Sequence, residues 1–324
     1  MTTFTRRSFI TVAAAATLLP RNAFAAFPER PITVIVPYAA GGAGDVTMRI
    51  LAEAMEKKLG QPIVVDARAG GGGTIGANAV ATSAPDGYTL MMGATNNFVI
   101  NQFMFPKVKF DPLASFTPIT KAAIVPSVMY VNNDVPVKTL GELVAYAKAN
   151  SGKLSYSSPS VGTTPHLSVE RLKQMTGIDI VHVPYRGAPP AMQAVVTGEV
   201  QLYLAGWGVG RGFVETGKVK ALAVASEQRL PNVPNIPTAS ESGVPGFVAD
   251  NWWALAAPRG TPQPVIDTLY AAISAALQDP AVRKKLDDLA FLPGGETPAQ
   301  TAEAMKAEAA TWEATIAKGK LAVD

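Results

Sequence analysis

Residues 31–45 of the chain read PITVIVPYAAGGAGD. The β-branched run 32–36, which ends at a proline and is soon followed by paired glycines, predicts a short buried strand. Behind the glycines, apolar residues recur at helical spacing from Val46 to Leu59, and Gly60 ends the pattern. The sequence therefore predicts a strand, a glycine-rich turn and a helix from about 45 to 59, which together begin an α/β fold.

The same alternation continues along the chain. A strand at 63–65, a helix at 76–83 and a strand at 88–92 complete a β-α-β-α-β unit, which implies a parallel sheet covered by helices on both faces. Further strands are expected at 127–131, 154–157, 180–183, 200–204 and 219–225, and further helices at 140–149, 165–175 and 189–197.

The character of the sequence changes after Ala225. Prolines and glycines between 231 and 246 predict a long irregular connection, at which we expect the chain to cross between lobes. A strand at 252–257 and helices at 264–278, 280–289 and 297–318 follow. Two lobes are expected because about 300 residues exceed what one hydrophobic core usually holds.

The first 25 residues have the order of a secretory signal. Arg6 and Arg7 precede an apolar run from Ile10 to Leu19, and small residues provide a cleavage point near Ala25. The run has about ten residues, whereas a membrane-spanning helix needs roughly 20. Adjacent arginines followed by Ser-Phe-Ile favour a twin-arginine signal, and an ordinary secretory signal is the alternative. The mature protein is therefore expected in the periplasm.

Composition excludes several classes of protein. The chain has no cysteine, so it has no disulfide framework, no thiolate chemistry and no residue for a lipid anchor at the mature N-terminus. It has 28 Lys and Arg against 25 Asp and Glu, and without Arg6, Arg7 and Arg21 it has 25 of each. Because no basic run remains in the mature chain, nucleic acid is not expected as a partner.

Three strand-to-helix turns, at 37–45, 157–165 and 184–190, share one physical character. Glycines let the backbone approach a ligand, and the following helix offers unpaired N–H groups, so each turn suits an anion. Ligands of open α/β sheets bind beyond the carboxyl ends of the strands. The alternative for each turn is a purely structural role. The candidate ligand contacts are Tyr38, Ala40, Gly41, Gly42, Asp45, Thr95, Asn96, Ser158, Ser160, Gly162, Thr163, Thr164, His166, Tyr185, Arg186 and Trp207.

Three of these residues have two interpretations each. Asp45 either caps the helix that it opens, which we favour, or contacts a ligand amine. Arg186 either pairs with a carboxylate or lies solvated on the surface. His166 either supports the site from the first turn of its helix or contacts only backbone.

Enzyme motifs are weak. Residues 71–76 contain G-x-G-x-x-G, but the acidic residue that a dinucleotide site needs about 20 positions later is missing. His166 and His182 have no acidic or cysteine companions at metal-ligand spacing, so no metal is expected. Ser160 is not in a G-x-S-x-G elbow. The sequence favours a binding protein without a cofactor, and a periplasmic enzyme acting on a small organic acid is the alternative.

Several sequence blocks together indicate a family. They are IVPYAAGGAGD at 35–45, APDGYTL at 84–90, PHL at 165–167, HVPYRG at 182–187, LAVAS at 222–226 and AAPRGTP at 256–262. With these blocks in this order, the mature chain resembles the Bug/TctC family, the periplasmic receptors of tripartite tricarboxylate transporters.

The resemblance implies a fold and a function. It implies a two-lobed periplasmic binding protein (type II, Venus-flytrap) with a mixed sheet in each lobe and a hinge between them. Residues 26–124 and 250–324 would form lobe 1, and residues 125–249 would form lobe 2. The lobes would close on a carboxylate held by backbone N–H groups, hydroxyls and ordered water. The receptor, expected to be a monomer, would deliver this acid to membrane transporter subunits.

One departure from the family pattern bears on the ligand. Where the family often has an acidic residue after the strand at 200–204, this chain reads Ala205-Gly206-Trp207. An amino acid is therefore a less suitable ligand, because its ammonium group would need a carboxylate partner. Trp207, Trp252, Trp253 and Phe98 suggest aromatic walls and an aromatic carboxylate or dicarboxylate. For at least one of Trp252 and Trp253, a place in the core is the favoured interpretation.

Overall fold

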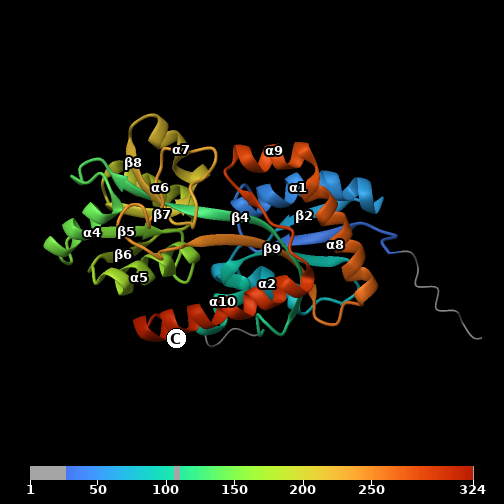
Figure 1. Ribbon diagram of the computed structural model, residues 1–324. Helices are drawn as coiled ribbons and strands as arrows, with labels where there is room; N and C mark the ends of the chain where they lie inside the picture. Colours follow the sequence, from blue (N-terminus) through green and yellow to red (C-terminus); the bar gives the residue numbers. More distant parts are fainter. Residues whose placement is uncertain (1–26, 106–109, 324) are drawn as a thin grey trace, which may run out of the picture.

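The structure is a computed structural model that describes residues 27–105 and 110–323. The expected signal peptide and its cleavage point near Ala25 lie outside the described residues. Figure 1 shows two halves joined by two long strands, with helices covering the sheet of each half. The predicted α/β, two-lobed class with mixed sheets is confirmed.

The first half is built on the unit that residues 31–45 begin. Strands β1 (Ile32–Val36), β2 (Ile63–Ala67) and β3 (Thr89–Ala94) are parallel, in the order β2-β1-β3. Strand β9 (Asp250–Pro258) then pairs antiparallel with β3. Helices α1 (Ala43–Leu59), α8 (Gln263–Gln278) and α9 (Pro280–Asp288) bury one face, whereas α2 (Thr74–Ala81) and α10 (Pro298–Gly319) bury the other.

The second half has a sheet of its own. Strands β5 (Ser155–Ser158), β6 (Val181–Pro184) and β7 (Leu202–Gly206) run parallel to one another, and β8 (Val219–Val224) lies beyond the strand that links the halves. The helices of this half are α4 (Leu140–Ala149), α5 (Thr164–Thr176), α6 (Ala188–Thr197) and α7 (Trp207–Glu215). The expected strands lie within one or two residues of these.

Strand β4 (Phe116–Asn132) is the longest strand and belongs to both sheets. Its first part pairs with β9, and its last part pairs with β7 and β8. The sequence predicted only its end, at 127–131, because Pro118 and Pro126 argue against a paired strand. The register shifts next to Pro118, so a bulge accommodates this proline within the ladder.

Two short elements were not predicted either. A π-helical turn, η2 (Asn96–Ile100), and the helix α3 (Asn101–Met104) follow β3. Helix α7 is glycine-rich, which disfavours a helix, but Gly210 gives room to the ring of Tyr130. The hydroxyl of Tyr130 donates to Trp207 O at 3.0 Å and anchors the start of α7.

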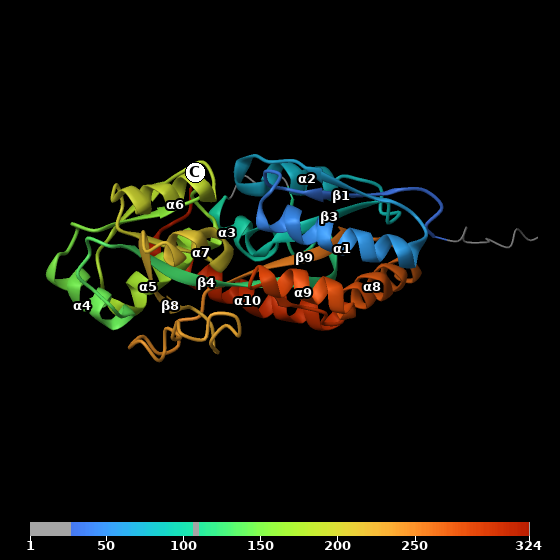
Figure 2. The same ribbon diagram turned by 90° about the horizontal axis from the view of Figure 1, so that it is seen from above.

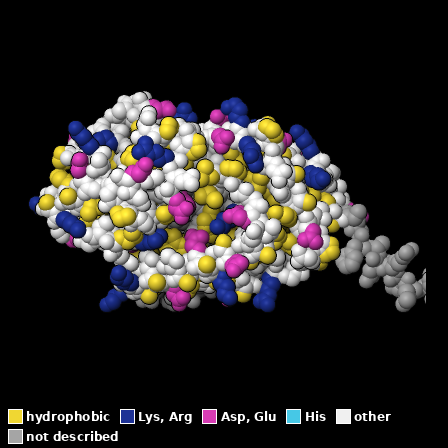
Figure 3. All heavy atoms as spheres, viewed as in Figure 1, with side chains coloured by type: hydrophobic (Ala, Val, Ile, Leu, Met, Phe, Trp, Pro, Cys, Tyr) yellow, Lys and Arg dark blue, Asp and Glu magenta, His cyan; other side chains and the backbone are white. Residues whose placement is uncertain are grey.

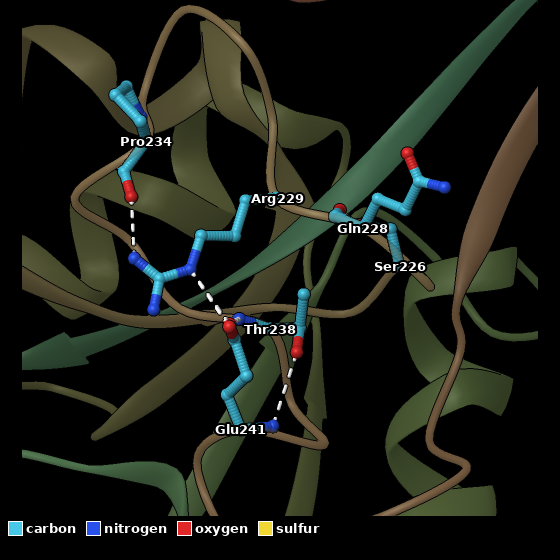
Figure 4. Close-up of polar contacts among 6 residues, drawn as sticks. All are labelled: Ser226, Gln228, Arg229, Pro234, Thr238 and Glu241. Atoms are coloured by element: carbon cyan, nitrogen blue, oxygen red, sulfur yellow. Dashed lines mark hydrogen bonds and ion pairs between the residues drawn. The ribbon is translucent and has the colours of Figure 1, made fainter.

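The connection between β8 and β9 is irregular, as predicted, and side chains hold it together. Figure 4 shows Arg229 bound to Glu241 at 2.8 Å and to Pro234 O at 2.8 Å, while Glu241 N donates to Thr238 Oγ1 at 3.1 Å. Its apolar residues pack into the core of the second half. The crossing back to the first half is therefore made by β9 itself.

Helix α10 runs along one side of the molecule beneath both halves (Figure 1). Glu308 of α10 accepts from Trp252 Nε1 at 2.7 Å, and Gln174 Nε2 of α5 donates to Thr315 O at 3.0 Å. Beyond the helix, Val323 N donates to Met104 O at 2.8 Å. The end of the chain is thus fastened to α3.

The surface is mixed in charge. On the face drawn in Figure 3, Lys and Arg alternate with Asp and Glu, and no large patch of one sign is visible. Among the described helices, none is both long and apolar enough to cross a membrane.

Gly44 provides a test of the packing beneath the first turn. A Cβ at Gly44 would overlap the ring of Trp253, whereas a Cβ at Gly212 of α7 would meet no atom within 4 Å. We expect Gly44→Ala to lower the free energy of unfolding by about 1–3 kcal/mol through overpacking. Gly212→Ala, the matched control, should leave it unchanged or raise it by about 0.5–1 kcal/mol. Urea unfolding of both variants measures this, and equal stabilities would contradict it.

Candidate functional site

Tyr38 follows β1 and is held on two sides. Its hydroxyl donates to Asn96 Oδ1 at 2.6 Å and lies 3.1 Å from Asn97 Oδ1. Its ring packs edge-on against Trp253, with 5.3 Å between ring centres. Burial raises the pKa of Tyr38 well above its usual value, despite both asparagine contacts, so the hydroxyl stays protonated. The proton of this hydroxyl is therefore donated within the protein, to Asn96.

The structure corrects the interpretation of Asp45 as a helix cap. Helix α1 begins at Ala43, so Gly42 takes the capping position and Asp45 is the third helical residue. Asp45 Oδ2 accepts the N–H of Gly41 at 2.9 Å, and Arg49 binds the carboxylate at 3.0–3.1 Å. Burial alone would raise the pKa of Asp45, but its bonds to Arg49 and Gly41 lower it. Asp45 therefore holds the turn in shape as a paired anion.

The first turn of α1 offers backbone donors. The first helical hydrogen bond runs from Val46 N to Gly42 O at 3.0 Å. Within the described chain, the N–H groups of residues 43–45 have no backbone acceptor. Residues 39–42, just before them, are exposed and include the candidates Ala40, Gly41 and Gly42. Unpaired N–H groups at a helix N-terminus suit an anion, and ligand binding at this turn stays a prediction.

Thr95 and Asn96 are buried behind this turn. Thr95 Oγ1 accepts the N–H of Trp252 at 2.9 Å, which ties the end of β3 to β9. Asn96 Nδ2 donates to Gly72 O at 2.9 Å, and its Oδ1 is the acceptor for Tyr38. The glycine-rich turn 70–73 thus packs against Asn96, and the side chains of Thr95 and Asn96 are occupied internally.

The hydroxyls of the turn between β5 and α5 are also directed inward. Ser158 and Thr163 both donate to Ser160 O, at 2.9 and 2.8 Å. Thr164 Oγ1 donates to Asn251 Oδ1 of β9 at 3.3 Å, across the boundary between the halves. These three hydroxyls shape the turn, and the sequence had treated them as donors to the ligand.

The backbone of this turn remains available. Leu167 N donates to Thr163 O at 3.1 Å, and in the described residues the N–H groups of 163, 164 and 166 have no backbone acceptor. Gly162 N donates to His166 Nδ1 at 3.2 Å. Helix α6 begins Ala-Pro-Pro, and its two prolines carry no N–H. The best anion seats are therefore the first turns of α1 and α5.

A stack of three rings lies beneath the α5 turn. The rings of His166 and His182 are 4.0 Å apart, and that of Tyr156 lies 4.9 Å from His182. Burial lowers the pKa of His166 to about 4, with a smaller effect of Lys173. Burial and then the neighbouring His166 lower the pKa of His182 to about 3. Both imidazoles are therefore neutral near pH 7. His166 accepts a hydrogen bond from the backbone N–H of Gly162, and a role in supporting a ligand site stays a prediction.

Ser158 and His182 form a contact that sequence spacing did not reveal. Ser158 Oγ lies 2.6 Å from His182 Nε2. Ser158 Oγ also donates to Ser160 O, and the donor and acceptor in its contact with His182 depend on the tautomer of the imidazole. Ser158 is fully buried. The contact ties the turn before α5 to β6.

The turn between β6 and α6 contains the candidates Tyr185 and Arg186. Tyr185 OH donates to Glu199 Oε1 at 2.8 Å, on the outside of the protein. Burial and the Glu199 carboxylate raise the pKa of Tyr185 to about 12. Arg186 is exposed, which agrees with the solvated interpretation.

The proposed aromatic walls are mostly core. Phe98 stacks on Trp252 at 5.7 Å, and both rings are buried. Trp253 lies under the first turn of α1 and supports Tyr38. Trp207 is buried where α7 meets the end of α9. The expectation that at least one of Trp252 and Trp253 is core is borne out by their burial.

Sequence reasoning missed four residues that shape the site: Asn97, Phe105, His182 in its contact with Ser158, and Asn251. Asn97 and Asn251 act through partners far away in sequence, which spacing cannot reveal. The only signal for Phe105 is an aromatic residue soon after β3.

Comparisons with known proteins agree with this geometry. The family described as tripartite tricarboxylate transporter family receptor, TctC, matches residues 47–321. The chain belongs to the TctC family. This receptor is 37% identical over 297 residues to the "UPF0065 protein in tcbD-tcbE intergenic region" of Pseudomonas sp. (strain P51), covering 91% of this chain and 88% of that protein.

Solved structures resemble this TctC receptor over nearly its whole described length. R. palustris Rpa4515 with adipate superposes with a TM-score of 0.85 at 33% identity, covering 91% of this chain and 99% of that one. MatC (Rpa3494) from Rhodopseudomonas palustris with bound malate gives 0.81 at 36% identity, covering 90% and 100%.

The chemistry of the receptor's candidate site is that of binding. Two helix N-termini, one from each half, offer N–H groups that favour negative charge. In the described ranges, no group of three or more His, Asp and Glu residues is arranged to hold a metal ion.

The buried histidines predict a pH dependence of stability. Their folded pKa values, about 4 and 3, lie below the usual value of about 6.5 expected in the unfolded chain. Their contribution to stability is therefore complete above about pH 6.5 and is lost as the pH falls toward 4 and 3. Over that range each histidine takes up a proton on unfolding, so stability falls as the pH falls, and solvent screening reduces the share of the partly exposed His182.

The double variant His166→Gln, His182→Gln separates this effect from that of the carboxylates. We expect its free energy of unfolding to fall less steeply than wild type between pH 6.5 and 4.5. Urea unfolding at several pH values measures both slopes, and parallel slopes would show that the histidines are not buried as neutral rings.

Proposed function

We propose that this receptor binds a small organic carboxylate, with linear dicarboxylates as the leading class, and delivers it in the periplasm to membrane transporter subunits. The observation that carries the proposal is the pair of unpaired helix N-termini, α1 at residues 43–45 and α5 at residues 163–166, one in each half. A dicarboxylate has one anionic group for each.

The contacts between the two halves support a mechanism in which the halves close around the ligand. We assign residues 26–124 and 250–324 to one lobe and 125–249 to the other, with β4 and β9 as the hinge. Thr164 of one lobe already reaches Asn251 of β9 at 3.3 Å. Closure about the two strands would bring the seats on α1 and α5 toward the same ligand.

Neutral surroundings favour an acid over an amino acid. Asp45 is paired with Arg49, and the buried Ala205 stands where an acidic partner for an ammonium group would be needed. Since Rpa4515 is described with adipate and MatC with malate, related receptors take dicarboxylates. Aromatic acids are the second class, because the ring of Tyr38 borders the α1 seat, although Phe98 and Trp252 are core.

A binding panel tests the proposal. Protein unfolded and refolded to remove carried ligand is titrated calorimetrically with succinate, malate, adipate, citrate, glutamate, benzoate and terephthalate. We expect heat of binding with at least one dicarboxylate and none with glutamate. Chromatography should recover the acid unchanged after long incubation. Conversion of the acid would favour the enzyme alternative, and silence across the panel would reject the proposed function.

The role of the α1 N–H groups has its own test. Gly42 has an extended backbone (ψ 168°), which suits a proline at residue 43, the first helical position. Ala43→Pro removes one N–H donor without interrupting α1, so we expect acid binding to weaken about 10- to 100-fold at nearly unchanged stability. Ala43→Ser, which keeps the N–H, should bind like wild type. Equal affinities of all three proteins would exclude this seat.

A further inference from the structure

The ring of Phe105 touches both glycine turns that border the candidate site. Phe105 ends α3, and its N–H donates to Asn101 O at 2.9 Å. A Cβ placed at Gly162 would lie 2.9 Å from Phe105 Cζ and 3.0 Å from Cε2. A Cβ placed at Gly72 would lie 3.7 Å from Cε2 and 3.8 Å from Cζ. The same edge of one ring therefore lies between a turn of each half.

Neither turn is suited to fill this space itself. Gly72 and Gly162 have positive φ angles of 63° and 76°, a conformation that residues with a Cβ adopt only at a cost. Phe105 is partly exposed and packs on the core beside α2 and α10. Figure 2 shows α3 at the boundary between the halves. The shape of this end of the site thus depends on the side chain at position 105.

Both turns lead directly to the proposed anion seats. Gly72 O accepts from Asn96, which in turn accepts from Tyr38 of the α1 turn. Gly162 immediately precedes the free N–H groups of α5 and donates to His166. An acid bound to the α5 seat therefore has the edge of Phe105 as a neighbour.

We propose that Phe105 determines the chain length of the acid that the receptor prefers, by closing one end of the site between the Gly72 and Gly162 turns. This inference rests on the proposed function. The ring occupies volume that a longer carbon chain would need, and a smaller side chain opens that volume. Contacts with one methylene in an apolar site change affinity about tenfold or more.

Calorimetric titration with linear dicarboxylates from succinate to suberate tests this proposal. The proteins are wild type, Phe105→Ala, Phe105→Leu and Phe103→Ala. Phe103 is the matched control, because it is a partly buried phenylalanine of α3 that packs on the same core. We expect Phe105→Ala to bind the longer acids at least about tenfold more tightly relative to the shorter ones than wild type does. Phe105→Leu should shift the preference in the same direction by less, and Phe103→Ala should keep the wild-type order.

Each outcome is decisive. An unchanged length preference in folded Phe105→Ala, or in Phe105→Leu if the alanine variant does not fold, would overturn the inference while the proposed function stands. An equal shift in Phe103→Ala would also overturn it, because the effect would then belong to the packing of α3. If the wild-type protein binds no acid of this linear series, the inference fails, and the proposed function fails with it only if the wider panel of acids is also silent.

Discussion

The hydrogen bonding of one strand to two sheets is the constraint on which this receptor depends. Strand β4 pairs with β9 in the first half and with β7 and β8 in the second, so the halves share continuous backbone. Strand β9 pairs antiparallel with both β3 and β4. Through these pairings the carboxyl ends of β1 and β3 have a defined position relative to those of β5 and β7. Asp250, at the start of β9, is buried near Glu308 and Glu227, and its pKa is raised to about 7 by burial first and these carboxylates second.

In the candidate site, side chains and backbone groups have different roles. Hydroxyls and carboxylates that look like ligand contacts in the sequence, such as Thr164 and Asp45, are occupied in holding turns in shape. The groups left free are backbone N–H groups, which cannot ionise and do not move without moving the helix. Such a site favours a negative charge through fixed dipoles and avoids burying a cation. In the proposal made above, specificity among acids depends on the surrounding shape, to which the ring of Phe105 contributes.

Local patterns in the sequence predicted much of this architecture because they arise from local physics. The strand 32–36, its glycine turn and the following helix have a clear apolar period, and the structure has them at Ile32–Val36 and Ala43–Leu59. The first part of β4 was missed because prolines argue against a paired strand, and the bulge next to Pro118 is created only by tertiary pairing with β9. Helix α7 was missed because its glycines disfavour a helix, and only the structure shows that one of them, Gly210, gives room to the ring of Tyr130. The sequence identified the turns that contain the candidate site residues. It did not identify their hydrogen-bond partners, which lie up to 157 residues away, as for Thr95 and Trp252, because no local pattern specifies such distant contacts.

The hydrogen bond between Val323 and α3 affects where a reporter group can be attached to the protein. Val323, the last described residue, is hydrogen-bonded to Met104, the residue next to Phe105. An affinity tag or fluorescent reporter attached directly after Val323 would therefore start beside α3. A dye at that place would respond to events at α3 itself and could disturb them. For a sensor of small acids, the exposed turn at Gly152, which follows α4, is the better point of attachment, because Figure 2 shows α4 at the end of the second half away from α3.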